Sequence, residues 1–183
     1  LFHGDRLVHQ LNWSNHQAYG ARVFVYPLSD PERYGVAEFD TLGRVVSIEE
    51  KPLIPKSNYA ITGLYFYNND VVEIAKTIKP SERGELEITD LNNIYIKRKN
   101  MNAIKMKKGS VWLDTGTINS LMQANQYVQV VEERQGRKIG CIEEAAYYSG
   151  FINKDQLLKL AEPLIKSGYG DYLVSIANQW KVW

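Results

Sequence analysis

The chain has 183 residues, of which 44% are hydrophobic and 23% are charged, a composition typical of a globular protein. Its 22 basic and 21 acidic residues give a formal net charge of +1, so no global field favours a polyanion, and we expect no nucleic-acid partner. The sequence has no apolar run of about 18 residues and no signal-peptide pattern, so we expect no membrane partner. A single cysteine excludes an internal disulfide, which suits a reducing compartment, and we expect a cytoplasmic protein.

The first part of the chain is predicted to form mainly strands. Residues 1–15 carry a weak helical pattern, and residues 21–28, rich in Val, Phe and Tyr, predict a central strand. Residues 35–39 and 45–50 predict two further strands. Residues 40–43 join them, and Asp at the first position with Gly at the fourth favours a type I turn.

A polar pair closes the last of these strands. Alternation places Glu50 on the same face of the strand as apolar residues. Because burying an unsatisfied carboxylate costs free energy, Glu50 should either lie at the solvated end of the strand or bind a polar partner. Pro52 cannot donate to a sheet ladder, so the strand should end there and leave Glu50 and Lys51 at a rim that a ligand can reach. Residues 61–67 are apolar on both faces, as expected of an interior strand. The pair is compatible both with a binding site and with a surface ion pair after an ordinary hairpin.

Two helices are predicted next. Residues 70–79 have a helical apolar stripe that Asp70 could cap and Pro80 should end. Residues 85–99 predict a second helix, whose acidic start suits a helix N-terminus. A turn is expected at residues 100–102, before a strand at residues 103–107.

An acid lies in the short apolar run at residues 111–117, V-W-L-D-T-G-T. From its local sequence, Asp114 is a candidate site residue, a turn residue or a capping acid. Thr115 or Thr117 can cap the helix predicted to follow at residues 118–134.

The end of the chain predicts two packed helices at residues 155–166 and 169–180, which Gly168 separates. Pro163 should begin or kink a helix, because it lacks the backbone donor. The aromatic stripe of the last helix is expected to be core or subunit interface rather than a ligand site. We expect Cys141 to be buried.

Several of these segments carry motifs of a known family. E-E-K-P followed by T-G-L-Y-F-Y resembles the sugar-binding half of the bacterial glucose-1-phosphate thymidylyltransferases, within the sugar-nucleotidyltransferase family. The resemblance continues in D-P-E-R-Y-G-V-A-E-F-D, K-P-S-E-R-G-E-L-E-I-T-D, V-W-L-D-T-G-T and G-Y-G-D-Y-L, in family order over nearly the whole chain. Two other family motifs, the nucleotide loop G-G-x-G-T-R-L and a metal-binding Asp in a G-D-N turn, do not occur in these 183 residues. We therefore expect the chain to begin just after that turn.

The resemblance implies an α/β fold, the mixed-sheet C-terminal part of a Rossmann-like nucleotidyltransferase with a helical region at its end. Residues 1–117 would be the sugar-phosphate-binding part. Residues 118–183 would be a helical region for packing, regulation or assembly into a homo-oligomer. The implied reaction joins dTTP and glucose 1-phosphate to give dTDP-glucose and pyrophosphate. The chain alone would be inactive, because dTTP would bind only with the missing N-terminal part.

The resemblance also assigns the site residues. Lys51 would contact the phosphate, Glu50 would accept hydrogen bonds from sugar hydroxyls, and Asp114 would bind Mg²⁺, a hard cation that takes carboxylate oxygens. The remaining members, Gly35, Ile61, Tyr65 and Trp112, would shape and wall the sugar pocket. The alternative is a non-catalytic module that binds a sugar phosphate or serves in oligomerisation and regulation.

Overall fold

A computed structural model describes residues 1–4, 7–16, 20–81 and 83–178. The chain divides into two compact units, Leu1–Ser120 and Leu121–Trp183. The boundary falls in the first turn of helix α4 (Ile118–Gln135), and each unit is described by itself.

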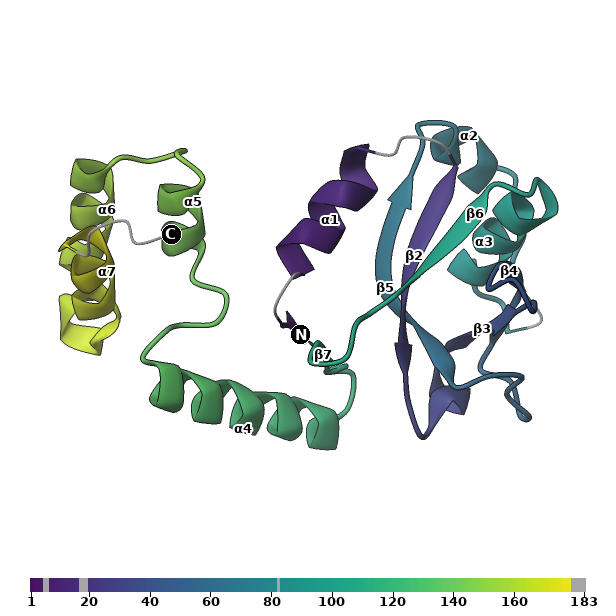
Figure 1. Ribbon diagram of the computed structural model, residues 1–183, viewed down its shortest axis with the longest axis horizontal. Helices are drawn as coiled ribbons and strands as arrows, with labels where there is room; N and C mark the ends of the chain where they lie inside the picture. Colours follow the sequence, from purple (N-terminus) through teal and green to yellow (C-terminus); the bar gives the residue numbers. More distant parts are fainter. Residues whose placement is uncertain (5–6, 17–19, 82, 179–183) are drawn as a thin grey trace. The chain divides into compact units, whose positions relative to one another are not determined.

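The first unit is built on a five-stranded mixed sheet with the strand order β4-β3-β5-β2-β6 (Figure 1). β2 is antiparallel to β5 and parallel to β6, so it is flanked on both sides, which confirms the predicted central strand. The α/β class with a mixed sheet is likewise confirmed. The strands are β2 (Ala21–Pro27), β3 (Gly35–Phe39), β4 (Val45–Glu50), β5 (Tyr59–Tyr67) and β6 (Met101–Lys105).

Helices α2 (Val71–Ala75) and α3 (Ile88–Lys97) pack on one face of this sheet (Figure 1). Leu91 and Tyr95 are one helical turn apart on α3, and both bury against Ala21 of β2. The acidic segment that was expected to open this helix lies before it instead. α3 also contacts β4, the edge strand where the polar pair lies, because its Asn93 side chain hydrogen-bonds the backbone of Ile48.

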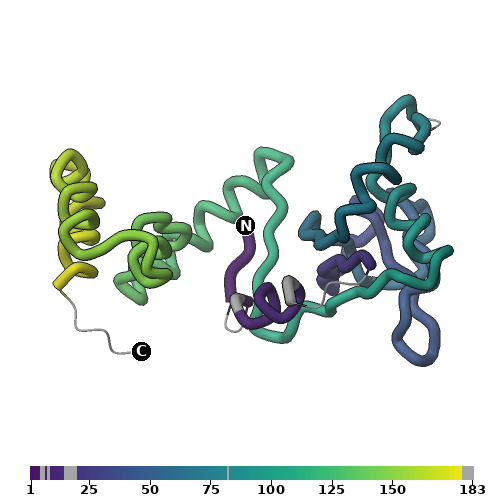
Figure 2. Tube along the Cα trace, turned by 90° about the horizontal axis from the view of Figure 1, so that it is seen from above, coloured from purple at the N-terminus to yellow at the C-terminus, as the bar shows by residue number. Residues whose placement is uncertain are grey.

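The opposite face is covered by α1 (Leu7–His16) and by a two-stranded sheet of β1 (Phe2–His3) and β7 (Val111–Trp112). Phe24 of β2 points to this side, where it belongs to one buried cluster with Trp112. Figure 2 shows the N-terminal segment running beside the segment that carries β7. The main sheet is therefore a layer between two covers, and Trp112 is held at its rim.

The helix predicted at residues 70–79 is shorter than expected, because α2 ends at Ala75, well before Pro80. The capping role of Asp70 is wrong. Its carboxylate accepts a hydrogen bond from the Tyr95 hydroxyl at 2.8 Å and pairs with Arg98 at 3.3 Å. Both carboxylate oxygens of Asp70 therefore contact α3 and do not cap α2.

The turn predicted at residues 100–102 is also wrong. β6 already begins at Met101, which pairs with Ala21 in the parallel ladder. The chain changes direction earlier, at Lys99, whose φ of 55° is in the left-handed region. The four-residue turn between β3 and β4 is confirmed by the hydrogen bond from Gly43 N to Asp40 O at 2.9 Å.

The second unit is helical. Its core joins Leu157, Leu173 and Ile176, which are at most 1% exposed. The apolar stripe of the last helix is thus intramolecular core over its described residues, and Trp180 lies outside them. Cys141 is buried, as expected. After α4 the elements are α5 (Ile142–Tyr148), α6 (Lys154–Ala161), the 3₁₀ helix η2 (Glu162–Ser167) and α7 (Tyr169–Asn178).

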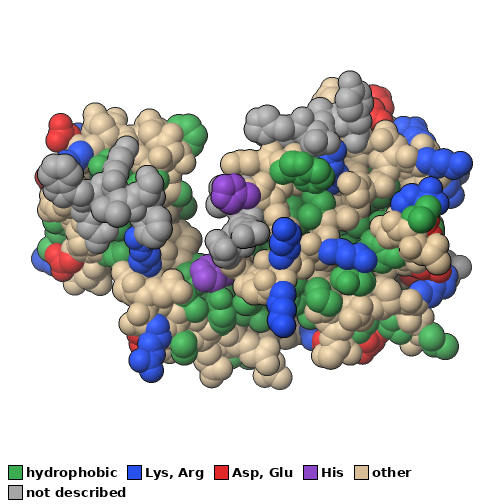
Figure 3. Space-filling view, viewed as in Figure 1, with side chains coloured by type: hydrophobic (Ala, Val, Ile, Leu, Met, Phe, Trp, Pro, Cys, Tyr) green, Lys and Arg blue, Asp and Glu red, His purple; other side chains and the backbone are tan. Residues whose placement is uncertain are grey.

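Pro163 lies where α6 gives way to η2, so the predicted proline effect is a change of helix type. Gly168, with a φ of 77°, then separates η2 from α7. Among the described helices, none combines the length and the hydropathy that crossing a membrane requires. On the face drawn in Figure 3, basic side chains lie singly or in small groups among hydrophobic and other side chains.

Candidate functional site

A pocket of about 270 Å³ in the first unit is lined by all seven residues that the motifs assign to the site. Antiparallel pairing of β3 with β4 sets Gly35 opposite Glu50, and the single β3–β5 pair, Val36 with Ala60, brings the start of β5 alongside. β7 and the loop after it close the pocket. The seven residues are Gly35, Glu50, Lys51, Ile61, Tyr65, Trp112 and Asp114.

Glu50, the last residue of β4, is partly exposed at the pocket rim. Its Oε2 accepts a hydrogen bond from the Thr89 hydroxyl at 2.7 Å. Within the described part of the chain its other oxygen, Oε1, has no hydrogen-bond partner. The cost of placing a carboxylate on an apolar face is thus met by one hydrogen bond and by solvent, and one oxygen stays free to accept.

Lys51 has a φ of 45°, and Lys99 is the other non-glycine residue of the described chain with a positive φ. This conformation is costly for an L-residue with a Cβ. The Lys51 backbone N–H donates to Tyr34 O at 3.0 Å and ties the end of β4 to the start of β3. The Lys51 side chain is exposed and has no ion pair with any described residue, so its ammonium is free to meet an anion.

Aromatic side chains wall the pocket. Trp112 is 8% exposed, and its ring meets Tyr34 edge-on, with centroids 5.1 Å apart and an interplanar angle of 63°. Burial, with a smaller contribution from the Glu50 charge, raises the pKa of Tyr65 to about 12. Burial also raises the pKa of Tyr34. Both phenols are therefore neutral donors at pH 7, beside an apolar floor at Ile61.

Asp114 is partly exposed in the loop after β7, and its Oδ2 accepts a hydrogen bond from Gly116 N at 3.3 Å. It does not cap α4, because Thr117 Oγ1 takes that role by accepting from Ser120 N at 3.1 Å. The described residues contain no group of three or more His, Cys, Asp or Glu able to hold a metal ion. One carboxylate still fits Mg²⁺, which takes one or two protein carboxylates and completes its shell with phosphate oxygens and water.

Six further lining residues were not assigned from the sequence. All six stand in the quoted motifs D-P-E-R-Y-G, T-G-L-Y-F-Y and E-I-T-D, so the motifs contain them without marking them as pocket residues. Their places in the pocket depend on strand pairing and on the docking of α3, which the motifs do not reveal. The six are Arg33, Tyr34, Thr62, Gly63, Ile88 and Thr89.

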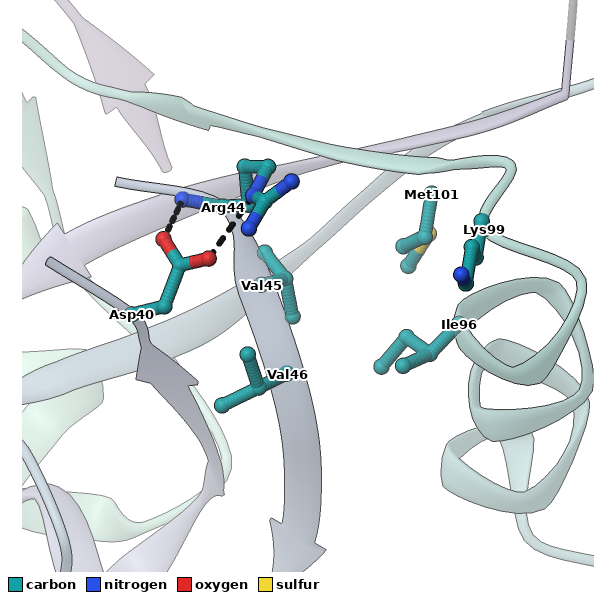
Figure 4. Close-up of a pocket in the computed structure, with 7 residues that line it drawn as sticks. All are labelled: Asp40, Arg44, Val45, Val46, Ile96, Lys99 and Met101. Carbon is teal, nitrogen blue, oxygen red and sulfur yellow. Dashed lines mark hydrogen bonds and ion pairs between the residues drawn. The ribbon is translucent and has the colours of Figure 1, made fainter. Parts of the chain in front are cut away.

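A larger pocket, of about 410 Å³, lies between the β3–β4 turn and the C-terminal end of α3 (Figure 4). Arg44 Nε pairs with Asp40 Oδ2 at 2.7 Å on one side of it, and Lys99 lies on the other side. This pocket contains none of the seven assigned residues. Its remaining lining is apolar, from Val45, Val46, Ile96 and Met101.

Comparison with known proteins bears on this geometry. A family model described as nucleotidyl transferase matches residues 5–130. A glucose-1-phosphate thymidylyltransferase from Actinoplanes sp. is 48% identical over 183 residues, covering 97% of this chain and 60% of that protein. One from Mycolicibacterium smegmatis is 47% identical over 179 residues, covering 98% of this chain and 62% of that protein. The chain thus spans about 60% of the length of these relatives.

Two solved structures share the fold. A Bacillus anthracis protein described as a glucose-1-phosphate thymidylyltransferase, crystallised in complex with sucrose, is 42% identical with a TM-score of 0.59, covering 69% of this chain and 50% of that one. A UDP-glucose pyrophosphorylase in complex with UDP-glucose is 25% identical with a TM-score of 0.57, covering 67% of this chain and 48% of that one. Family model, relatives and fold agree, and the chain belongs to the nucleotidyl transferase family.

Proposed function

We propose that this chain is the acceptor half of a nucleotidyltransferase that joins dTTP and glucose 1-phosphate to give dTDP-glucose and pyrophosphate. The observation that carries the proposal is the convergence of seven motif residues, far apart in sequence, on one pocket. The relatives named as glucose-1-phosphate thymidylyltransferases support the choice of sugar phosphate.

In this proposal the pocket holds glucose 1-phosphate by its two chemically different ends. The exposed ammonium of Lys51 binds the phosphate, and the free Oε1 of Glu50 accepts a hydrogen bond from a sugar hydroxyl. The neutral hydroxyl of Tyr65 is a donor beside them, and Ile61 and Trp112 lie under the apolar faces of the sugar ring.

The attacking atom is a phosphate oxygen, which is already an anion at neutral pH, so the reaction needs no strong general base. Its rate would depend on in-line placement of the reactants and on neutralisation of the phosphate charges. Lys51 supplies positive charge at the acceptor. Asp114 would supply one carboxylate to a bound Mg²⁺, which neutralises phosphate charge when it is present.

We further propose that the chain alone makes no dTDP-glucose, because its 183 residues lack the G-G-x-G-T-R-L loop that holds the nucleotide in this family. The same absence favours the alternative function, a module that binds a sugar phosphate without turning it over.

We also propose that the chain forms a homo-oligomer through its second unit, where Ile142 and Phe151 are 75% and 83% exposed. The mass measured by light scattering should then fall on dilution.

Calorimetric titration tests the binding site. Glucose 1-phosphate should bind the unchanged chain, and Lys51→Ala should weaken binding by about tenfold or more, the effect of losing one hydrogen bond to a charged group. Lys99→Ala is the matched control, because Lys99 shares the positive φ but lies in the other pocket. Equal affinity of Lys51→Ala and the unchanged chain would remove Lys51 from the site.

A further inference from the structure

The carboxylate of Glu50 is held from an element that the site motifs did not assign. Thr89, in the first turn of α3, is 6% exposed and donates its hydroxyl to Glu50 Oε2 at 2.7 Å. Four residues later on the same helix, Asn93 bridges the backbone of Ile48. Its Oδ1 accepts from Ile48 N at 3.2 Å and its Nδ2 donates to Ile48 O at 3.0 Å.

The two contacts form one clamp whose spacing follows from helix and strand geometry. Thr89 and Asn93 are about 6 Å apart along α3. Their partners Glu50 and Ile48, on one face of β4, are about 6.6 Å apart. α3 can therefore reach both strand residues at once. One contact fixes the backbone of β4, and the other fixes a side chain inside the proposed sugar pocket.

Gly35 leaves room for the side-chain contact. A Cβ at this position would lie 3.2 Å from Glu50 Oε2 and 3.5 Å from Thr89 Oγ1. The first distance is tighter than most Cβ contacts, so with a Cβ at this position the carboxylate would have to shift by a few tenths of an ångström. Three segments thus meet at one oxygen atom: the start of β3, the end of β4 and the start of α3.

We propose that Thr89 is a positioning residue for sugar recognition: its hydroxyl holds Glu50 Oε2 so that Oε1 faces the pocket and accepts from a sugar hydroxyl. The inference rests on the proposed function, because it takes a sugar phosphate as the ligand. Thr89 acts through Glu50 and need not touch the sugar. The phosphate end, at Lys51, is bound independently of it.

The test compares two ligands on four forms of the full 183-residue chain: unchanged, Thr89→Val, Thr89→Ser and Asn93→Ala. Glucose 1-phosphate reports the sugar and phosphate contacts together, and inorganic phosphate reports the phosphate contact alone. Thr89→Val keeps the shape and loses the donor, so it should weaken glucose 1-phosphate about fivefold to tenfold and leave inorganic phosphate unchanged. Thr89→Ser should restore the lost affinity.

Asn93→Ala removes the other half of the clamp without touching the carboxylate. It should lower the melting temperature and leave both affinities unchanged. In a Glu50→Ala background, Thr89→Val should have no further effect, because the group it positions is gone. The affinity measured in the Glu50→Ala background therefore separates a positioning role of Thr89 from general support of the fold.

Three results would overturn the inference. Equal affinity of Thr89→Val and the unchanged chain for glucose 1-phosphate would overturn it alone and leave the proposed function standing. A parallel loss of inorganic phosphate binding in Thr89→Val would show a structural role only. Failure of the unchanged chain to bind glucose 1-phosphate would overturn the proposed function, and this inference with it.

Discussion

Lys51 combines an unfavourable backbone conformation with a position at the pocket rim. Its φ of 45° is in a region that costs an L-residue about 1–2 kcal/mol. Strain of this kind persists where the surroundings fix it, and here the hydrogen bond from Lys51 N to Tyr34 O does so. The conformation places a free ammonium beside the proposed phosphate position.

A pair of substitutions separates strain from binding. Lys51→Gly should be more stable than Lys51→Ala, with a free energy of unfolding about 1 kcal/mol higher, because glycine adopts a positive φ without the Cβ clash. Both should lose glucose 1-phosphate affinity to the same extent, since both lack the ammonium. Urea unfolding measures the first quantity and calorimetry the second. An alanine variant as stable as the glycine variant would show that the backbone at this residue is unstrained.

Asp40 makes the β3–β4 turn sensitive to acid. Its Oδ1 accepts from the backbone N–H groups of Arg44 at 2.8 Å and Leu42 at 2.9 Å, and its Oδ2 pairs with the Arg44 side chain. These contacts, the Arg44 backbone donor first, lower the pKa of Asp40 below its usual value. A lowered carboxyl pKa stabilises the fold above the usual Asp value of about 3.9, and the stabilisation is lost as the pH falls through the lowered value.

Asp40→Asn should therefore be less stable than the unchanged chain at pH 7, and the difference should shrink as the pH falls below about 4. Urea unfolding at pH 7, 5 and 3 measures it. Asp90→Asn is a control, because Asp90 is an exposed acid of α3 that shares none of the Asp40 contacts. A difference that stays constant across these pH values would mean that the charge of Asp40 does not support the turn.

Among the secondary-structure elements, local sequence predicted the strands more accurately than the short helices. β3 and β4 have the predicted bounds, because alternation and the Asp-to-Gly turn between them are local signals. α2 begins directly after Asp70 but ends at Ala75, because the next backbone hydrogen bonds, from Thr77 N to Ile74 O and from Ile78 N to Ala75 O, are turn bonds. β6 begins early because it pairs in parallel with β2, a strand distant in sequence. A contact between distant segments therefore accounts for the early start of β6.

In the candidate site, too, local motifs predicted some features, whereas others depend on contacts between distant segments. The family motifs named the seven residues that the pocket brings together. Thr89 was not assigned although it stands in a quoted motif, because its importance appears only when α3 docks on β4 and the hydroxyl reaches Glu50. The free oxygen of Glu50 and the positive φ of Lys51 likewise depend on coordinates rather than on residue type.

β5 has the sequence of an interior strand but one open edge. It pairs with β2 along both of its ends, from Ala21–Tyr67 to Pro27–Tyr59, whereas its pairing with β3 is limited to Val36–Ala60. In the part of the chain that the structure describes, no strand pairs with residues 61–67 on that second edge. A strand that is apolar on both faces and open at an edge is a template for another strand.

We therefore expect a strand from the part of the relatives that this chain does not span to pair with residues 61–67 of β5. In the chain alone, backbone amides of this edge should exchange hydrogen rapidly. They should become protected when the missing part of the Actinoplanes relative is added as a separate polypeptide. Amides that β5 donates to β2 are the internal control, since their partner is already present. An edge whose exchange is unchanged on mixing would contradict the expectation.

For the molecule as a whole, we propose a competent acceptor half that has no nucleotide cradle. In-line positioning of two reactants can supply roughly 7–11 kcal/mol of a reaction barrier. The pocket gathers the residues proposed to bind one reactant, glucose 1-phosphate, and one carboxylate, Asp114, proposed to bind a metal ion. Without the nucleotide loop the second reactant would not be positioned, so we expect no measurable turnover from the chain alone.

Pyrophosphate release from dTTP, Mg²⁺ and glucose 1-phosphate tests this proposal. It should be measured with the chain alone, with the separately made missing part of the Actinoplanes relative alone, and with the two mixed. We predict release only from the mixture, and loss of that release when the chain carries Asp114→Asn. Release by the chain alone would contradict the proposal, and so would a mixture whose rate does not depend on Asp114 or on glucose 1-phosphate.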